Sequence, residues 1–289
     1  MTTTTAFLSR HERFGSVGST NDIVRDWLSA GIPEVCLAVA GEQTAGRGRS
    51  GRAWVAPEGA ALLLSLGFRP RYLAPDRVWR LAGVVALAMA DAAEAVAGLP
   101  DGKLRLKWPN DIVLELPGGV RKVAGVLGET EGVGTAEPVA VVGLGTNADW
   151  PPDQFPEALA GSMSSLREAS GGRPIDSTEL LEAFLLRLEP RVLALRDGLF
   201  DVAGWHDRQV TTGRMVELEL PDGSTERVRA VGVDGVTGGL LVEEADETAA
   251  EREVLVGEVV HVRLAADEVV AGGPSGVVSA ADERGGVTN

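Results

Sequence analysis

The sequence predicts an α+β protein in which helices pack on a mixed β-sheet, followed by a small antiparallel β-barrel. Up to about residue 209, apolar runs of strand length are interspersed with helical stretches. From Val210 the pattern changes to short alternating strands separated by glycine-rich turns. The chain has 289 residues, of which 44% are hydrophobic and 24% charged, so it is long and apolar enough to bury a core.

The first elements follow from apolar periodicity and end signals. A helix is expected from Thr20 to Ala30, with Ser19 at its N-cap, and another over residues 76–97, which ends at the sequence GLPDG. Strands are expected where apolar residues run together or alternate with polar ones. The expected strands cover residues 35–43, 61–68, 103–108, 111–116, 122–130 and 138–147.

The later chain is expected to contain one amphipathic helix before the barrel. Asp176 and Glu179 have the spacing of a capping box, which starts this helix, and Pro190 should kink or break it. The predicted organisation is a flexible N-terminal arm (1–14), a large unit (15–209), a small β-barrel (210–264) and a disordered tail (265–289).

Composition excludes several classes of protein. A net charge of −15 argues against nucleic acid or an anionic membrane surface as the main partner. Cys36 is the single cysteine, which excludes an intrachain disulfide framework and a cysteine-based zinc site. Neither a leader peptide nor an apolar membrane span is evident, so we expect a soluble, cytoplasmic protein.

The basic residues are unevenly distributed. Residues 1–126 carry 15 basic and 12 acidic residues, so the acidity belongs to the later part of the chain. There are 24 arginines but only three lysines, Lys103, Lys107 and Lys122. Because lysine is scarce, each one is a candidate for a specific role.

The run GRGRSG, residues 46–51, has two interpretations. It matches the dinucleotide fingerprint G-x-G-x-x-G in letters only, because a proline and no helical pattern follow it. It is either a flexible surface hairpin or a mobile lid whose guanidinium groups close over a phosphate or carboxylate. Three arginines within six residues (Arg47, Arg49 and Arg52) repel one another in a free loop, which favours an anionic ligand.

Two further segments carry the remaining lysines of interest. KWPND is good turn chemistry, but it also places Lys107, Asn110 and Asp111 at a strand end, where an acid can hold Mg²⁺ among phosphate oxygens. Lys122 opens the next strand and is either solvated or able to neutralise a reacting carboxylate and phosphate.

Two weaker motifs complete the set. GSTN, residues 18–21, is N-cap chemistry that can also offer donors to a polar ligand. GLGTN, residues 143–147, ends a buried strand, where glycines allow a ligand to approach the backbone. The histidines at positions 11, 206 and 261 show no metal-ligand spacing.

In this order and spacing, the motifs GSTN, GEQTAGRGRSGRAW, LKWPND, RKVAG and GLGTN resemble those of bacterial biotin protein ligases over roughly residues 15–264. The resemblance implies a catalytic domain of the class II aminoacyl-synthetase and biotin-ligase type over 15–209 and an SH3-like barrel over 210–264. It implies a short form without the N-terminal DNA-binding domain of some relatives, because only about 14 residues precede GSTN. The implied reaction joins biotin and MgATP to biotinyl-5′-adenylate and then acylates a lysine of a carrier protein.

The resemblance also assigns roles. Biotin contacts are implied for Ser19, Thr20, Gln43, Arg47, Gly48, Arg49 and Lys122; adenine contacts for Trp54 and Asn147; phosphate or metal contacts for Asn110 and Asp111. The other candidate binding residues are Asn21, Gly46, Lys107, Gly125 and Gly145. Lys122, Arg47 and Arg49 would neutralise the reacting anions, and Asp111 would take the proton of the carrier amine.

The implied partner is a biotin carboxyl carrier protein domain, and the chain is expected to be a monomer or a ligand-linked homodimer. Two alternatives stay open. One is a lipoate-type protein ligase or acyltransferase, which shares the adenylate chemistry; the GRGR and KWPND blocks favour biotin. The other is a sensor that binds biotin or biotinyl-adenylate without transferring it.

Overall fold

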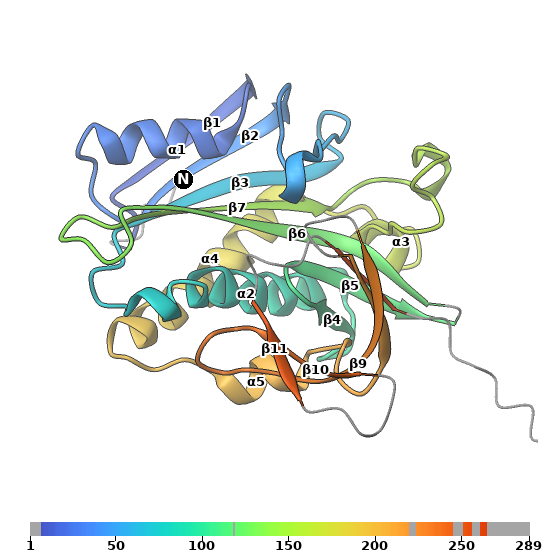
Figure 1. Cartoon of the computed structure of the whole chain (residues 1–289). Coiled ribbons are helices and arrows are strands. Elements are labelled where there is room, and N and C mark those ends of the chain that lie inside the picture. The colour runs from blue at the N-terminus through green and yellow to red at the C-terminus, as the bar shows by residue number, and fades with distance from the viewer. Residues whose placement is uncertain (1–6, 118, 220–223, 245–250, 256–260, 265–289) are drawn as a thin grey trace, which may run out of the picture.

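The computed structural model describes residues 7–117, 119–219, 224–244, 251–255 and 261–264. Seven strands form one sheet in the order β1-β2-β3-β7-β6-β5-β4, in which only β1 and β2 are parallel (Figure 1). The strands are β1 (Arg10–Val17), β2 (Cys36–Gln43), β3 (Ala61–Phe68), β4 (Leu104–Lys107), β5 (Asp111–Leu116), β6 (Gly119–Glu131) and β7 (Val139–Asn147). The helices are α1 (Thr20–Ser29), α2 (Arg80–Ala97), α3 (Leu166–Ala169), α4 (Ser177–Arg196) and α5 (Val202–Asp207). The expected α+β class with a mixed sheet is confirmed.

Alternation along β2 divides the core between the two faces of this sheet. Leu37 and Val39 belong to the large apolar cluster beneath α2 and α4, whereas Cys36 and Ala38 pack with α1 on the opposite face. Figure 1 shows α1 on one side of the sheet and α2 with α4 on the other. The single cysteine is therefore buried under α1.

β1 corrects the expected N-terminal arm. The Thr-rich start predicted a flexible segment over residues 1–14, but β1 begins at Arg10 and pairs in parallel with β2, and Leu8 is buried. None of the residues of β1 is fully buried. The strand is thus defined by its hydrogen bonds to β2, which apolar periodicity does not report.

The helix ends differ from expectation in two places. α2 begins at Arg80, because residues 75–77 form a separate short 3-10 helix ahead of it. α4 begins after its N-cap Asp176 as expected, but it continues through Pro190 to Arg196. Proline removes one N–H, and the carbonyl four residues earlier belongs to the 74% exposed Leu186, where water can reach it.

The C-terminal residues form a second, antiparallel sheet in the order β11-β10-β9-β8-β12. Its strands are β8 (Met215–Glu219), β9 (Thr225–Val233), β10 (Leu240–Glu244), β11 (Arg252–Val254) and β12 (His261–Leu264). Within the described ranges β11 and β12 are the edges of an open sheet, so closure into a barrel stays a prediction. The tail expected for residues 265–289 lies outside the described residues.

The turn between β9 and β10 docks on the first unit through indole donors. Nε1 of Trp79 donates to the carbonyl of Val236 (2.7 Å), and Nε1 of Trp108 donates to the carbonyl of Gly238 (2.9 Å). Gly238 has a φ of +75°, and a Cβ atom there would lie 2.5 Å from the Trp79 ring. Only glycine therefore allows this close approach.

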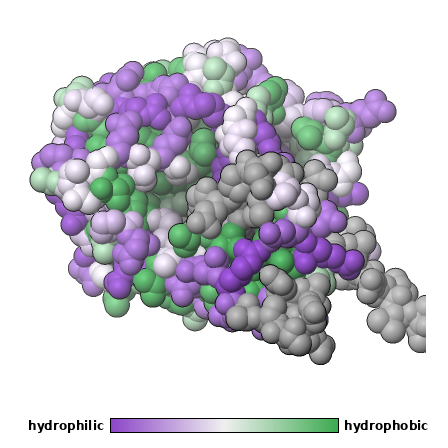
Figure 2. Space-filling model, in the orientation of Figure 1, coloured by the Kyte–Doolittle hydropathy of each residue, from purple (hydrophilic) through white to green (hydrophobic). Residues whose placement is uncertain are grey.

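The surface and the helices add two observations. On the face shown in Figure 2, hydrophilic and apolar residues are interspersed. In the part of the chain that the structure describes, no helix is long and apolar enough to cross a membrane.

Candidate active site

A row of paired residues across four strands forms the floor of the candidate site. Gly145 of β7 pairs with Gly125 of β6. Gly125 pairs with Asp111 at the start of β5, and Asp111 pairs with Lys107 at the end of β4. Paired residues of adjacent strands point to the same face of a sheet. The two glycines therefore leave a hollow that is bounded on one side by a carboxylate and an ammonium group.

This hollow is part of a cavity of about 360 Å³. Its walls come from the start of α1, the end of β2, the loop after β2, the KWPND turn and the segment before α3. The residues that line it include Ser19, Thr20, Asn21, Gln43, Arg47, Gly48, Arg49, Arg52, Trp54, Lys107, Asn110, Asp111, Lys122, Gly125, Leu127, Gly143, Gly145, Asn147, Ser162 and Met163.

Asp111 lies between two lysines at one end of the cavity. Its Oδ1 is 2.6 Å from Nζ of Lys122, and its Oδ2 is 3.5 Å from Nζ of Lys107. The Asp111 and Lys107 side chains are only 14% and 13% exposed. Burial by itself would raise the pKa of Asp111, but the two ammonium groups outweigh burial and hold that pKa below its ordinary value. Burial lowers the pKa of Lys107, and Asp111 opposes that shift.

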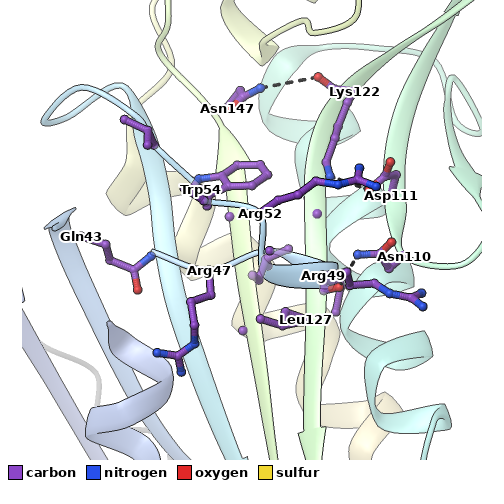
Figure 3. A pocket seen from close by; sticks show the side chains of 18 of the residues that line it. Gln43, Arg47, Arg49, Arg52, Trp54, Asn110, Asp111, Lys122, Leu127 and Asn147 are labelled. Carbon is purple, nitrogen blue, oxygen red and sulfur yellow. Dashed lines mark hydrogen bonds and ion pairs between the residues drawn. The ribbon is translucent and has the colours of Figure 1, made fainter. Parts of the chain in front are cut away.

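A bulge in β6 brings Lys122 to this position. The register of β6 against β5 shifts at Val123, which is left as the extra residue. The backbone N–H of Lys122 donates to the carbonyl of Ser162, and its carbonyl accepts from the N–H of Ser164, both at 2.8 Å. Bulges re-aim side chains next to active sites, and here the Lys122 side chain points at Asp111 (Figure 3).

The indole of Trp54 lies on the glycine floor. A Cβ atom at Gly145 would lie 2.5 Å from Cε2 of this ring, and one at Gly125 would lie 3.3 Å from Cζ3. Nζ of Lys122 is 5.3 Å from the ring centroid. The indole Nε1–H is buried without a hydrogen-bond partner, which leaves a donor for a ligand.

At the other end of the cavity, polar side chains cluster around the start of α1. Gln43 Oε1 accepts from the backbone N–H of Thr20 (2.7 Å) and lies 2.9 Å from the Thr20 hydroxyl. That hydroxyl is 2.7 Å from the Ser65 hydroxyl, which donates to Oδ1 of Asn21 at 2.5 Å. Nδ2 of Asn21 donates to Glu129 (2.7 Å). These groups form a connected network that reaches from the cavity to β6.

The glycine-arginine loop is a short hairpin with a tight base. The N–H of Trp54 donates to the carbonyl of Gly46 (2.9 Å), and the N–H of Gly48 donates to the carbonyl of Arg52 (2.7 Å). A Cβ atom at Gly46 would lie 2.5 Å from the carbonyl oxygen of Trp54. Ser50 has a φ of 55°, in the left-handed region that residues other than glycine adopt uncommonly.

Arg47 anchors this loop to α1. Its guanidinium donates to both carboxylate oxygens of Asp22, at 2.7 and 2.9 Å, and points away from Lys122 (Figure 3). This bidentate pair lowers the pKa of Asp22 from 3.8 to about 2. Arg49 lines the cavity, and burial lowers its guanidinium pKa while Asp111 opposes that shift.

Comparison with known proteins gives a consistent result. Residues 14–147 match the model of the biotin/lipoate A/B protein ligase family. The biotin–[acetyl-CoA-carboxylase] ligase of Mycobacterium tuberculosis is 32% identical over 249 residues, which are 85% of this chain and 86% of the relative. The chain belongs to the biotin protein ligase family. The Paracoccus denitrificans biotin–[acetyl-CoA-carboxylase] ligase is 36% identical over 54% of this chain and 62% of that protein.

A solved family member agrees in fold. The biotin protein ligase from Aquifex aeolicus in complex with biotin and ATP has a TM-score of 0.72 and 26% identity to this chain. The match covers 89% of this chain and 99% of that one. The structural likeness therefore extends well beyond the region that the family model matches.

In the present chain, the cavity brings together nearly all the residues that were singled out in the sequence. Gly46 is the member of the candidate set that does not line it, and its role here is to close the base of the hairpin. The amides of two candidates contact the backbone. Nδ2 of Asn110 donates to the carbonyl of Val126 (2.8 Å), and Nδ2 of Asn147 donates to the carbonyl of Ser164 (2.9 Å). Both amides hold walls of the cavity in place.

Sequence reasoning missed two residues of this site. Ser65 is fully buried beneath Thr20, and its signal was a single polar residue inside the apolar run ALLLSLGF. Arg52 was noted as a loop arginine but not as a candidate, yet it extends toward Asp111 in Figure 3. The sequence signal for Arg52 was its place three positions after Arg49 in the same arginine-rich loop.

Proposed function

We propose that the protein is an ATP-dependent ligase that activates biotin as biotinyl-5′-adenylate and transfers it to a lysine of a biotin carboxyl carrier protein. The observation that carries this proposal is the two-ended cavity. Uncharged Thr20 and Gln43 form one end, and the ammonium groups of Lys122 and Lys107 form the other. Biotin has an uncharged polar ring at one end and a carboxylate at the other, and these two parts match the two ends of the cavity.

The cationic end fits the first step. Forming an acyl-adenylate brings a carboxylate against an α-phosphate, and fixed cations stabilise such like-charged groups as they react. Lys122, Arg49 and Arg52 line this end. Because β6 and the hairpin hold these side chains before a ligand arrives, little reorganisation is needed during the reaction.

The role we assign to Arg47 differs from the sequence expectation. Its guanidinium is committed to Asp22, so it anchors the hairpin rather than facing the reacting groups. A closed hairpin excludes water from a reactive acyl-adenylate. We therefore keep Arg47 as a binding residue that acts through the loop.

The geometry also revises the role of Asp111. A carboxylate whose pKa is held below its ordinary value is a poor proton acceptor for an amine. We assign Asp111 instead to orient Lys122 and Lys107, which flank its two oxygens. The carrier amine must then lose its proton to another acceptor.

Magnesium enters the proposal with the nucleotide. In the described part of the chain, no group of three or more acidic, histidine or cysteine side chains could hold a metal ion by itself. Mg²⁺ bound to ATP phosphates needs only one or two protein carboxylates. Asp111 is the one carboxylate among the described lining residues, so it fits this role only in competition with its two lysines.

The remaining assignments accompany this function. We propose a catalytic unit over 15–209 and an SH3-like barrel over 210–264, built on the five-stranded sheet. The proposed partner is the carrier domain of a biotin-dependent carboxylase, and the ligase acts in the cytoplasm as a monomer or ligand-linked dimer without nucleic acid. The −15 charge supports the last point.

Pyrophosphate release tests the activation step. Purified protein is given MgATP with biotin, with lipoate or with neither, and released pyrophosphate is measured. We expect release with biotin only. Release with lipoate alone would identify the lipoate-type ligase instead. Binding of biotin without pyrophosphate release would identify a sensor.

A further inference from the structure

Ser65 is a fully buried hydroxyl that touches the cavity only through its neighbours. We infer that Ser65 fixes the Thr20 hydroxyl as a hydrogen-bond acceptor toward the cavity, so that this end of the site selects acids whose ring presents an N–H group. This inference rests on the proposed function, because it concerns how the same site recognises the acid. It follows from counting the hydrogens in the network.

The orientation of Asn21 is the starting point. A carboxylate accepts hydrogen bonds, so the group 2.7 Å from Glu129 must be the Asn21 amide nitrogen. Arg25 also donates to the same carboxylate oxygen at 2.7 Å. Oδ1 of Asn21 consequently faces Ser65 at 2.5 Å and can only accept. The single hydroxyl hydrogen of Ser65 is therefore used on Asn21.

The Thr20 hydroxyl also has a single hydrogen to donate. It lies 2.7 Å from the Ser65 hydroxyl, whose own hydrogen is already used. The single hydroxyl hydrogen of Thr20 therefore faces two acceptors, the Ser65 oxygen at 2.7 Å and Oε1 of Gln43 at 2.9 Å. Oε1 of Gln43 is oriented by the backbone N–H of Thr20 at 2.7 Å, so it too is an acceptor. When Thr20 donates to Gln43, the contact with Ser65 has no hydrogen. When Thr20 donates to Ser65, the 2.9 Å contact with Gln43 Oε1 has none.

A ligand can supply the missing hydrogen at the Gln43 contact but not at the Ser65 contact, because Ser65 does not line the cavity. A bound N–H group therefore favours the arrangement in which Thr20 donates to Ser65 and two acceptors face the cavity. Both Thr20 and Gln43 line the cavity. A buried acceptor without a donor is costly, and one ligand N–H placed between the two oxygens relieves that cost. A cyclic urea supplies such an N–H, whereas a dithiolane ring has none. Ser65 is accordingly a positioning residue that acts through Thr20.

Kinetics of the full-length protein test this inference. Ser65→Ala leaves the Thr20 hydroxyl free to donate to Gln43 instead, which weakens acceptance from the ligand. We expect the KM for biotin in adenylate formation to rise about fivefold, the scale of one neutral hydrogen bond. The KM for ATP should change less than twofold. Ser65→Cys keeps the size of the side chain and should also raise the KM for biotin, because a thiol is a weak donor.

A double-mutant cycle separates positioning from a general structural effect. Thr20→Val removes the hydroxyl through which Ser65 acts. Adding Ser65→Ala to Thr20→Val should therefore leave the KM for biotin unchanged. Ser170→Ala, which removes a partly buried serine hydroxyl that donates to the carbonyl of Arg167 outside the cavity, is the control and should leave the KM for biotin within twofold of wild type.

Two results would overturn the inference. One is an unchanged KM for biotin in both Ser65 variants. The other is the same increase from Ser65→Ala with and without the Thr20 hydroxyl. Either result in a wild-type protein that forms biotinyl-adenylate leaves the proposed function intact. A wild-type protein that forms no adenylate from biotin would instead remove both.

Discussion

Replacing Lys122 by methionine removes the ammonium group 2.6 Å from Asp111 while keeping a side chain of similar length. Lys122 is 35% exposed and faces the cavity, so its charge is available to a ligand. Removing one preorganised charged or donor group from a reacting site costs on the order of 10²–10³ in rate. We expect adenylate formation to slow at least tenfold, which corresponds to about 1.4 kcal/mol of transition-state energy.

A loss of stability is expected beside the loss of rate. Removing one partner of a fully buried ion pair costs about 3–5 kcal/mol. The cost here should be smaller, because Lys122 is partly exposed and Lys107 stays 3.5 Å from Asp111. With one ammonium group gone, the pKa of Asp111 should rise toward its ordinary value.

The assay is biotin-dependent pyrophosphate release at saturating biotin and ATP, with thermal unfolding measured on the same samples. The matched control is Lys103→Met, since Lys103 is an exposed lysine in the turn before β4. The control should retain wild-type rates. Wild-type adenylate formation by folded Lys122→Met would refute the assigned role.

Three further outcomes are expected. Gly145→Ala should lower the free energy of unfolding, measured by urea titration, by about 1–3 kcal/mol, because the added Cβ atom would collide with Trp54. Gly128→Ala is the control and should lower it less, because a Cβ atom there would meet nothing within 4 Å. Asp22 has a pKa of about 2 against an ordinary 3.8, so the stability from its ion pair is complete above about pH 4 and is lost as the pH falls toward 2. Thermal midpoints of Asp22→Asn should therefore vary less than wild type over this pH range. Amide exchange in residues 46–51 should slow when biotinyl-adenylate binds, and unchanged exchange would argue against the lid.

The apolar pattern of the sequence predicted most strands of the large sheet. Strands such as β3 (Ala61–Phe68) are buried throughout, so burial and hydrogen bonding favour the same limits. β1 could not be found in this way, because it has no buried residue and is defined by parallel pairing between Arg10 and Cys36 and onward. The proline inside α4 also did not end the helix, and the carbonyl that it leaves without a helical partner belongs to the exposed Leu186.

In the candidate site, too, the sequence predicted which residues come together but not the tertiary contacts that hold them. Motif order placed Asp111 and Lys122 together, but only the register shift in β6 explains why they touch. The partner of Arg47 is Asp22, 25 positions away, and no local pattern connects the two. Ser65 was hidden because one serine in an apolar strand does not reveal which face it occupies.

The central claim is the transfer of biotin to a carrier lysine, and the mass of the carrier tests it most directly. Purified protein is incubated with MgATP, biotin and an isolated biotin carboxyl carrier domain, and intact carrier mass is measured against a carrier with its acceptor lysine replaced by arginine. We expect the mass of one biotinyl group on the first carrier and none on the second. An unchanged carrier mass with biotin, in a protein that binds biotin and ATP, would contradict the account.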